Sequence, residues 1–191
     1  MEEKEWRSGQ RRAGIEGRDA LTADERRQRS GHIVERILAS DWWRESRTVL
    51  SYRAVRGEVD LSGLETAARE QGKRLCYPLC LSPGEMIALW PGGDAWKKGK
   101  FGIWEPVRER SVEVRPEELD LLLCPCTAFD DGGGRMGMGG GYYDRYLPRC
   151  KGHIAAVAFE AQRAGRIDAA PWDVPMERVY TENGVYPEEK A

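Results

Sequence analysis

Short apolar runs alternate with longer stretches of mixed polarity along the chain. Runs of four to eight apolar residues between turn residues are typical of strands. A strand that is covered on both faces of its sheet is apolar at every position. Six runs predict strands, at residues 48–52, 74–80, 86–90, 120–125, 153–159 and 178–182. Because helical stretches separate several of these runs, we expect an α/β fold. This fold would be a three-layer, mostly parallel, Rossmann-like sheet with helices on both faces.

Four stretches have helical patterns, and two of them carry a start signal. They are residues 4–20, 21–40, 61–72 and 142–150. Thr22 followed three residues later by Glu25 predicts a capping box at the start of the second helix. Ser62 and Glu65 repeat that spacing in the third, where Gly72 is a natural end.

Length and composition predict one domain over residues 1–191. With 40% hydrophobic and 32% charged residues and no repeat or low-complexity linker, the chain is typical of a globular domain that buries a core. The net charge of -2 gives no reason to expect nucleic acid or a membrane as partner. We therefore expect small-molecule substrates and a monomer.

Targeting and redox signals favour the cytoplasm. The first twelve residues are charged throughout and unlike a signal peptide, and the apolar stretch at 119–126 is too short to span a bilayer. Five cysteines, an odd number, indicate reduced thiols. Their spacing does not match a metal site, so buried structural thiols are the expected role.

The stretch GGGRMGMGGGYYDRY at 132–146 is the main candidate for chemistry, because it follows the apolar run 120–125. Ligands of α/β sheets bind at the carboxyl ends of strands. Glycines let successive backbone N–H groups turn toward one anion, typically phosphate. Arg135 could add a charged contact to phosphate, and Asp144 could hold Mg²⁺. On composition alone, a flexible surface loop stays open as the alternative.

Two common nucleotide motifs fit this stretch poorly. GGGRMG at 132–137 satisfies G-x-G-x-x-G, with Glu160 near the place of a ribose-binding acid. However, only residues 161–191 follow Glu160, too few for the rest of a dinucleotide-binding fold, which disfavours an oxidoreductase. The G-K-[ST] ending of a P-loop is missing as well.

Several segments together carry a family resemblance. RMGMGGGYYDRYL resembles a signature of the 5-formyltetrahydrofolate cyclo-ligase family, also called 5,10-methenyltetrahydrofolate synthetases. Similar segments follow the family's order over nearly the whole chain: SYRAVRGEVDL (51–61), GKRLCYP (72–78), FGIWEP (101–106), LLLCPCTAFDDGGGRMG (121–137) and PWDVPMERVYTE (171–182). The resemblance implies ATP- and Mg²⁺-dependent closure of 5-formyltetrahydrofolate to 5,10-methenyltetrahydrofolate, releasing ADP and phosphate. The formyl oxygen would be phosphorylated on the way.

The resemblance also implies roles for individual residues. The catalytic pair would be Arg135 and Tyr143. ATP would be bound by Arg7, Arg11, Arg135, Gly137, Gly139, Gly140, Gly141, Tyr142 and Tyr143. The folate would be bound by Arg53, Glu58, Phe101, Trp104, Met138 and Tyr142, and Mg²⁺ by Asp144 and Asp173.

The chain departs from the family pattern mainly in its first helical segment. The segment RDALTADER fixes a register in which Arg7 replaces the family lysine and Arg11 matches the arginine. Residues four apart share a helix face, so both could reach one phosphate chain. Lys4 would serve if the register shifts by one turn. Smaller departures are Leu61, where threonine is usual, and Met138, where an aromatic or basic residue is usual.

Each assignment has a structural alternative. Glu58 could be a solvated turn residue, Trp104 a core residue, Asp173 an ordinary loop aspartate, and the basic positions of the first helix a solvated face. At the level of the whole protein, the alternative is a catalytically idle relative that binds nucleotide or folate and acts through a partner. The departure at Arg7 leaves room for it.

Overall fold

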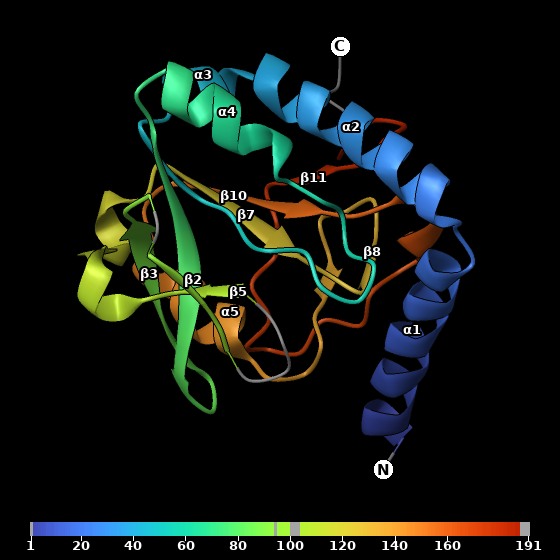
Figure 1. The fold of residues 1–191 in the computed structure, drawn as a ribbon. Helices are drawn as coiled ribbons and strands as arrows, with labels where there is room; N and C mark the ends of the chain where they lie inside the picture. Colours follow the sequence, from blue (N-terminus) through green and yellow to red (C-terminus); the bar gives the residue numbers. More distant parts are fainter. Residues whose placement is uncertain (1, 94, 100–103, 188–191) are drawn as a thin grey trace.

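The computed structural model describes residues 2–93, 95–99 and 104–187, and its centre is a twisted sheet of eight strands (Figure 1). The strand order is β12-β11-β10-β7-β1-β2-β3-β6. The bounds are β1 (Thr48–Leu50), β2 (Arg74–Ser82), β3 (Glu85–Pro91), β6 (Ser111–Val114), β7 (Leu121–Pro125), β10 (His153–Val157), β11 (Arg178–Tyr180) and β12 (Val185–Tyr186). Two small hairpins pair β4 (Trp96–Lys98) with β5 (Trp104–Pro106), and β8 (Ala128–Phe129) with β9 (Arg135–Met136).

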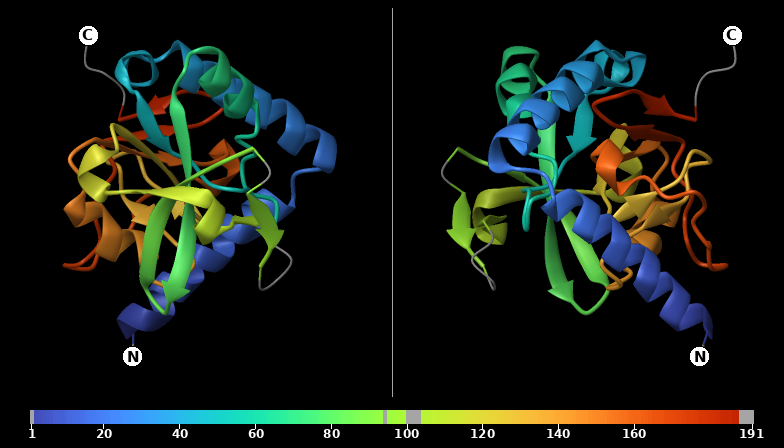
Figure 2. Two further views of the ribbon diagram at one scale, coloured as in Figure 1. Left: turned by 60° about the vertical axis from the view of Figure 1, so that its left-hand side comes forward. Right: turned by 90° about the vertical axis from the view of Figure 1, so that its right-hand side faces the viewer.

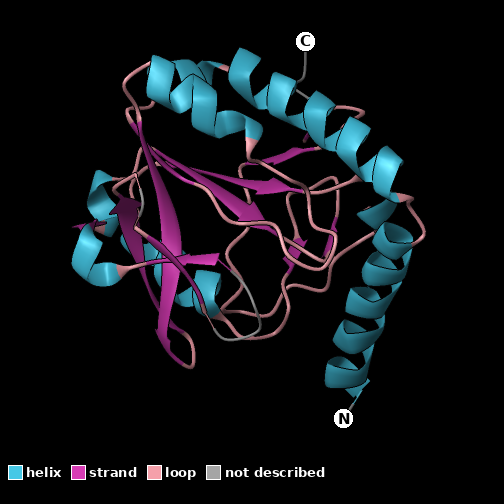
Figure 3. Ribbon diagram, viewed as in Figure 1, coloured by secondary structure: helices cyan, strands magenta, loops and turns pink. Residues whose placement is uncertain are grey.

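The middle of the sheet is parallel and its edges are antiparallel. Strands β2, β1, β7, β10 and β11 pair in parallel, whereas β3 and β6 at one edge and β12 at the other pair antiparallel. Helices α2 (Ala23–Ala39), α3 (Asp41–Glu45) and α4 (Gly63–Glu70) cover one face. Helix α5 (Tyr142–Tyr146) and the 3-10 turn Leu147–Arg149 cover the other (Figure 3). The predicted α/β class with a mostly parallel sheet is therefore confirmed.

Strand β7 shows why the sheet separates two cores. Leu121 and Leu123 pack in the cluster under α2 and α4, whereas Leu122 and Cys124 pack in the cluster under α5. Successive strand residues point to opposite faces, so an uninterrupted apolar run is what a strand with two covered faces requires. All four side chains are fully buried, as the sequence predicted.

The predicted capping box at Thr22 is confirmed, whereas at Ser62 the helix starts as predicted, with α4 beginning at Gly63, but the predicted capping box is wrong. The Glu25 N–H donates to Thr22 Oγ1 at 3.2 Å, and the Thr22 N–H donates to Glu25 Oε2 at 2.8 Å. Ser62 has helical backbone angles and makes no side-chain cap. Its N–H instead donates to Asp60 Oδ1 at 2.9 Å, and Glu65 pairs with Arg53 rather than with the helix start.

Helix α1 (Glu2–Asp19) packs against the loops beyond the carboxyl ends of the strands, apart from the other helices (Figure 2). Two glycines permit this close approach. A Cβ at Gly14 would lie 2.0 Å from the carbonyl oxygen of Thr127, and one at Gly17 would lie 2.1 Å from that of Ala161. No helix among the described residues is both long and apolar enough to cross a membrane.

Candidate active site

A cavity of about 430 Å³ opens between α1, the glycine-rich loop, α5 and the β2–β3 hairpin. Most of the predicted site residues meet there. They are Arg7, Arg11, Glu58, Arg135, Gly137, Met138, Gly139, Gly140, Gly141, Tyr142, Tyr143, Asp144 and Asp173. The loop between β9 and α5 therefore lies in the wall of a cavity, which favours a role in a binding site over the alternative of a flexible surface loop.

Arginine side chains hold the carbonyl groups of this loop. Arg11 Nε donates to the Gly137 carbonyl at 2.9 Å, and Arg145 Nη1 donates to the Gly140 carbonyl at 3.0 Å. Gly139 and Gly141 have φ values of 93° and 66°, a left-handed conformation that suits glycine and few other residues. The glycines at these two positions are therefore required by the path of the backbone.

Arg135 is the buried cation of the cavity wall, with 3% of its side chain exposed. Its Nη2 donates to Asp144 Oδ1 at 2.8 Å, and its guanidinium lies over the Tyr143 ring, 5.5 Å from the centroid. Burial raises the pKa of Tyr143 well above its ordinary value, so the phenol stays protonated and can donate a hydrogen bond. Arg135 offers a fixed positive charge, and Tyr143 a neutral donor beside it.

Helix α1 contributes two further guanidinium groups. Arg7 binds both carboxylate oxygens of Asp173, with Nη1–Oδ2 and Nη2–Oδ1 distances of 2.6 and 3.0 Å. Arg7 Nη1 also donates to the Asp168 carbonyl at 2.6 Å. Burial and the nearby charge of Arg7 lower the pKa of Arg11, which shows that the two cations are close. The solvated-face interpretation of this helix is wrong, because both side chains line the cavity.

Glu58 lies on the loop after β1, where it lines both this cavity and a second groove beside α2. It is partly buried in the cavity wall, and its Oε2 accepts the Val55 N–H at 3.1 Å. Burial raises the pKa of its carboxyl group, while the Val55 N–H and the charges of Arg18 and Arg56 oppose that rise. Glu58 therefore faces the cavity and is not the solvated turn residue of the alternative interpretation.

Three of the predicted folate contacts do not line the cavity or cannot be placed. Arg53 pairs with Glu65 at 2.6 Å, and its guanidinium stacks on Trp96 at 4.3 Å from the ring centroid. Trp104, on β5, is 51% exposed, so its interpretation as a core residue is wrong. Phe101 lies outside the described residues.

The two predicted magnesium carboxylates both line the cavity, and each is bound to an arginine. Asp173 also accepts the Ala170 N–H at 2.7 Å, which makes it more than an ordinary loop aspartate. Among the described residues, no three or more His, Cys, Asp or Glu side chains form a metal cluster. Mg²⁺ is commonly held by one or two carboxylates plus phosphate oxygens and water, so the donor set of Asp144 and Asp173 fits this ion.

Some cavity residues were not predicted as site residues from the sequence. They are Pro78, Cys80, Met86, Pro125, Cys126, Arg145 and Trp172. Arg145 and Trp172 belong to the family-like segments RMGMGGGYYDRYL and PWDVPMERVYTE, directly beside Asp144 and Asp173. Their position next to predicted metal ligands was a usable signal. Trp172 is 67% exposed at the cavity. The three residues of β2 and β3 lie in apolar runs that read as core, so no sequence signal marked them.

A glycine loop and several arginines surround one cavity of this α/β protein, beyond the carboxyl ends of its strands, which is an arrangement suited to anionic ligands. A model of the 5-formyltetrahydrofolate cyclo-ligase family matches residues 3–182. The chain therefore belongs to this family of ligases, as the resemblance predicted.

Individual relatives agree with this assignment. The solved structure of Aquifex aeolicus 5,10-methenyltetrahydrofolate synthetase matches with a TM-score of 0.85 and 32% identity, covering 97% of this chain and 94% of that one. The 5-formyltetrahydrofolate cyclo-ligase of Haemophilus influenzae is 29% identical, covering 82% of this chain and 87% of the relative. The mouse enzyme of the same name is also 29% identical, with 86% and 87% coverage.

Proposed function

We propose that this protein uses ATP and Mg²⁺ to close 5-formyltetrahydrofolate to 5,10-methenyltetrahydrofolate, with release of ADP and phosphate. The observation that carries the proposal is the single cavity of about 430 Å³ that joins arginines and glycines to Glu58. One set of groups suits a triphosphate, and the carboxylate suits a pterin. The proposal includes one domain over residues 1–191, a monomer, small-molecule substrates only and action in the cytoplasm.

The reaction needs positioning more than proton transfer. The γ-phosphoryl group passes from ATP to the formyl oxygen, and ADP leaves. The folate nitrogen at position 10 then attacks the formyl carbon and releases its proton to solvent, and the carbon–oxygen bond breaks with phosphate as the leaving group. Holding the phosphoryl group and its acceptor together and neutralising their charge supplies most of the rate in such transfers.

The arginines supply the charge for this step. Arg7 and Arg11 approach from α1 and would bind the phosphate chain, together with the loop from Gly137 to Gly141. Arg135 would stabilise the transferred group, and the protonated Tyr143 beside it would donate a hydrogen bond. Asp144 and Asp173 would hold Mg²⁺, which when bound neutralises charge on the phosphate oxygens.

Folate recognition falls to the groups on the remaining wall. The Glu58 carboxylate can accept two N–H donors from the amino-pyrimidinone edge of the pterin. Met138 and Tyr142 line the same cavity and can pack against flat rings. Arg53 and Trp104 do not line it in this structure, so we assign them no contact with the pterin.

The experiment is to mix the protein with 5-formyltetrahydrofolate, ATP and Mg²⁺ and follow the near-ultraviolet absorbance of the methenyl product. Omitting ATP or chelating Mg²⁺ gives the matched controls. We expect a rise that needs both. Folate binding with no rise in the complete mixture would refute the proposal and favour the catalytically idle relative.

A further inference from the structure

Arg145, in the last turn of α5, lines the cavity but has no part in the proposed chemistry. Its Nη1 donates to the Gly140 carbonyl at 3.0 Å. The same nitrogen lies 2.7 Å from the place of a Cβ on Gly141 and 2.0 Å from the place of one on Gly84. Gly84 belongs to the turn between β2 and β3. One guanidinium therefore contacts both the glycine-rich loop and the β2–β3 hairpin.

The turn between β2 and β3 leaves room for Arg145. Ser82 pairs with Glu85, so Pro83 and Gly84 form a two-residue turn. Gly84 has a φ value of 79°, and proline followed by glycine with a positive φ is the pattern of a type II turn. Gly84 is buried although Ser82, Pro83 and Glu85 are exposed. The Arg145 guanidinium covers Gly84, and a side chain at this position would occupy the same space.

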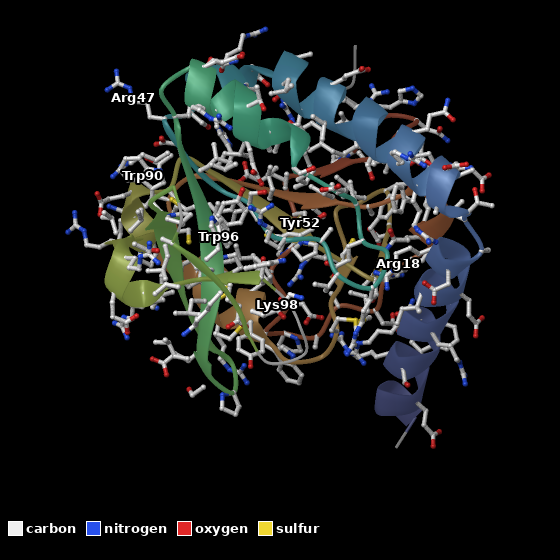
Figure 4. The ribbon with its side chains drawn as sticks, in the orientation of Figure 1. Arg18, Arg47, Tyr52, Trp90, Trp96 and Lys98 are labelled. Atoms are coloured by element: carbon white, nitrogen blue, oxygen red, sulfur yellow. The ribbon has the colours of Figure 1, made fainter. Side chains whose placement is uncertain are left out.

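Backbone pairing holds this hairpin only at its base. The pairing of β2 with β1 ends at Cys76 and that of β3 with β6 begins at Ala88, so residues 79–87 pair only with each other. Figure 4 shows the hairpin, in green, reaching past α5 to the lower end of the view, while the labelled Trp96 lies well above the turn. A two-stranded hairpin by itself is marginally stable in water. A contact at the turn therefore fixes the end of a segment whose Met86 lines the cavity.

The hydrogen bond from Arg145 also fixes the direction of one peptide group in the loop. The Gly140 carbonyl and the Gly141 N–H belong to one planar trans peptide, so they point in opposite directions. Because Arg145 holds the carbonyl, the N–H points away from the arginine, and it has no hydrogen-bond partner among the described residues. Glycines on both sides would otherwise let this peptide rotate. Arg11 holds the Gly137 carbonyl in the same way.

We propose that Arg145 is a positioning residue for ATP: it rests on Gly84 and fixes the peptide before Gly141, so that this N–H is available to a phosphate oxygen. The inference rests on the proposed function in one respect, namely that the anion bound at this loop is the phosphate chain of ATP. Arg145 itself need not touch ATP. Because Arg145 is exposed and its hydrogen bond is next to solvent, we expect a modest contribution to binding.

The test displaces Arg145 without removing it. In Gly84→Ala the new Cβ would lie 2.0 Å from Nη1, and because the end of a flexible side chain moves more easily than a hairpin, the arginine must leave its place. Gly72→Ala is the matched control, since Gly72 has a φ value of 65° but nothing lies within 4 Å of a Cβ there. Both variants share the backbone strain, and only one displaces Arg145. Arg145→Met removes the hydrogen bond directly.

The first measurement is the Kd of ATP with Mg²⁺, together with kcat and the KM for each substrate. Gly84→Ala and Arg145→Met should each weaken ATP binding about fivefold, equal to about 1 kcal/mol. Their kcat and KM for 5-formyltetrahydrofolate should stay within about twofold of wild type. Gly72→Ala should bind ATP as wild type does. The double variant should bind ATP no more weakly than Arg145→Met, because both changes remove one interaction. Additive losses, or an unchanged Kd in Gly84→Ala, would overturn the proposal.

The second measurement is the NMR order parameter of the amides of residues 139–141 in the ligand-free protein. It should fall from about 0.85 toward about 0.6 in Gly84→Ala and Arg145→Met, and stay unchanged in Gly72→Ala. Unchanged order parameters together with weaker ATP binding would mean that Arg145 contacts ATP directly, which would also overturn the positioning role. If Arg145→Met does not fold, Gly84→Ala decides in both measurements. A wild-type protein that binds no ATP refutes the proposed function, whereas the order parameters decide separately whether Arg145 holds the loop.

Discussion

Replacing Gly14 with alanine tests whether the close packing of α1 positions Arg7 and Arg11, the arginines proposed to bind ATP. The new Cβ would lie 2.0 Å from the Thr127 carbonyl oxygen, whereas real Cβ atoms essentially never approach within 3.0 Å. The helix or the backbone at Thr127 must therefore shift by about 1 Å, the difference between these distances. Arg11 Nε is 2.9 Å from the Gly137 carbonyl, and a shift of that size takes the pair out of hydrogen-bond range.

Two effects on stability oppose each other in this variant. Overpacking a tight contact costs about 1–3 kcal/mol, while alanine in place of glycine within a helix gains about 1 kcal/mol. We expect a net loss of about 1 kcal/mol. The larger effect is on ATP, because a hydrogen bond to a charged group contributes about 1.5–3 kcal/mol. Displacing Arg7 and Arg11 should raise the KM for ATP by about tenfold or more, with much less change for folate.

Gly9 provides the matched control on the same helix, since nothing lies within 4 Å of a Cβ built there. Gly9→Ala should leave the KM for ATP unchanged and stabilise the protein by up to about 1 kcal/mol. The assays are thermal unfolding and steady-state kinetics with each substrate varied. If Gly14→Ala and Gly9→Ala behave alike in both assays, the helix is not held by this contact and the reasoning fails.

Three other variants test separate parts of the site. Asp144→Asn should impair use of ATP and Mg²⁺ by about tenfold or more while folate binding changes little. It should also lower the free energy of unfolding by about 3 kcal/mol, because Arg135 loses its buried partner. An equal loss of ATP use and of folate binding would contradict the metal role. Burial raises the pKa of Glu58 above its ordinary 4.5, so its carboxyl contributes stability only at low pH and loses it as the pH rises. Glu58→Gln should therefore unfold at a higher temperature than wild type near neutral pH but not in acid, although it binds folate weakly, and an unchanged or lower unfolding temperature near neutral pH would refute this. Cys80 is exposed at the cavity, and the pKa of its thiol is raised. Thiol alkylation should therefore inactivate the enzyme faster at alkaline pH, and bound folate should protect against it. Inactivation of Cys80→Ser at the wild-type rate would show that another group reacts.

The core of the fold could be predicted from sequence because its signals are local. An apolar run such as Leu121–Pro125 has no other stable place than between two layers, and the Thr22 capping box is complete within four residues. The capping box at Ser62 failed for a reason outside that window: Arg53, from a preceding loop, attracts Glu65. The edge strands β6 and β12 and the hairpin strands β8 and β9 have two to four residues each, too few for a periodic pattern.

The site was predictable wherever a motif contained its residues, and less so where the fold brings distant segments together. The candidate site residues of the loop at 135–144 are neighbours in the sequence, so one motif contains them all. The contact between Arg7 and Asp173 joins residues 166 positions apart, and only the family resemblance suggested that both belong to one site. Cys80 had no signal, since an apolar strand end next to a cavity has the same sequence pattern as one next to the core. Arg145 lay in a motif, but its contact with Gly84 depends on a turn of a distant segment meeting α5.

The two arginine–carboxylate pairs of the cavity, Arg7 with Asp173 and Arg135 with Asp144, indicate how the proposed site would accept its charged ligand. Each pair compensates its own charge, so the arginines stay in the cavity wall without a ligand. Separating either pair would leave a partly buried charge uncompensated, which is strongly unfavourable. Phosphate oxygens can replace the carboxylates as partners of the arginines only if another cation then binds the carboxylates. Mg²⁺ can be that cation only if anions such as phosphate replace the carboxylates at the arginines. On the proposed function, the two pairs therefore favour binding of ATP and Mg²⁺ together over binding of either one alone. Each arginine would exchange its carboxylate for a phosphate and each carboxylate its arginine for Mg²⁺, so that no charge is buried without a partner.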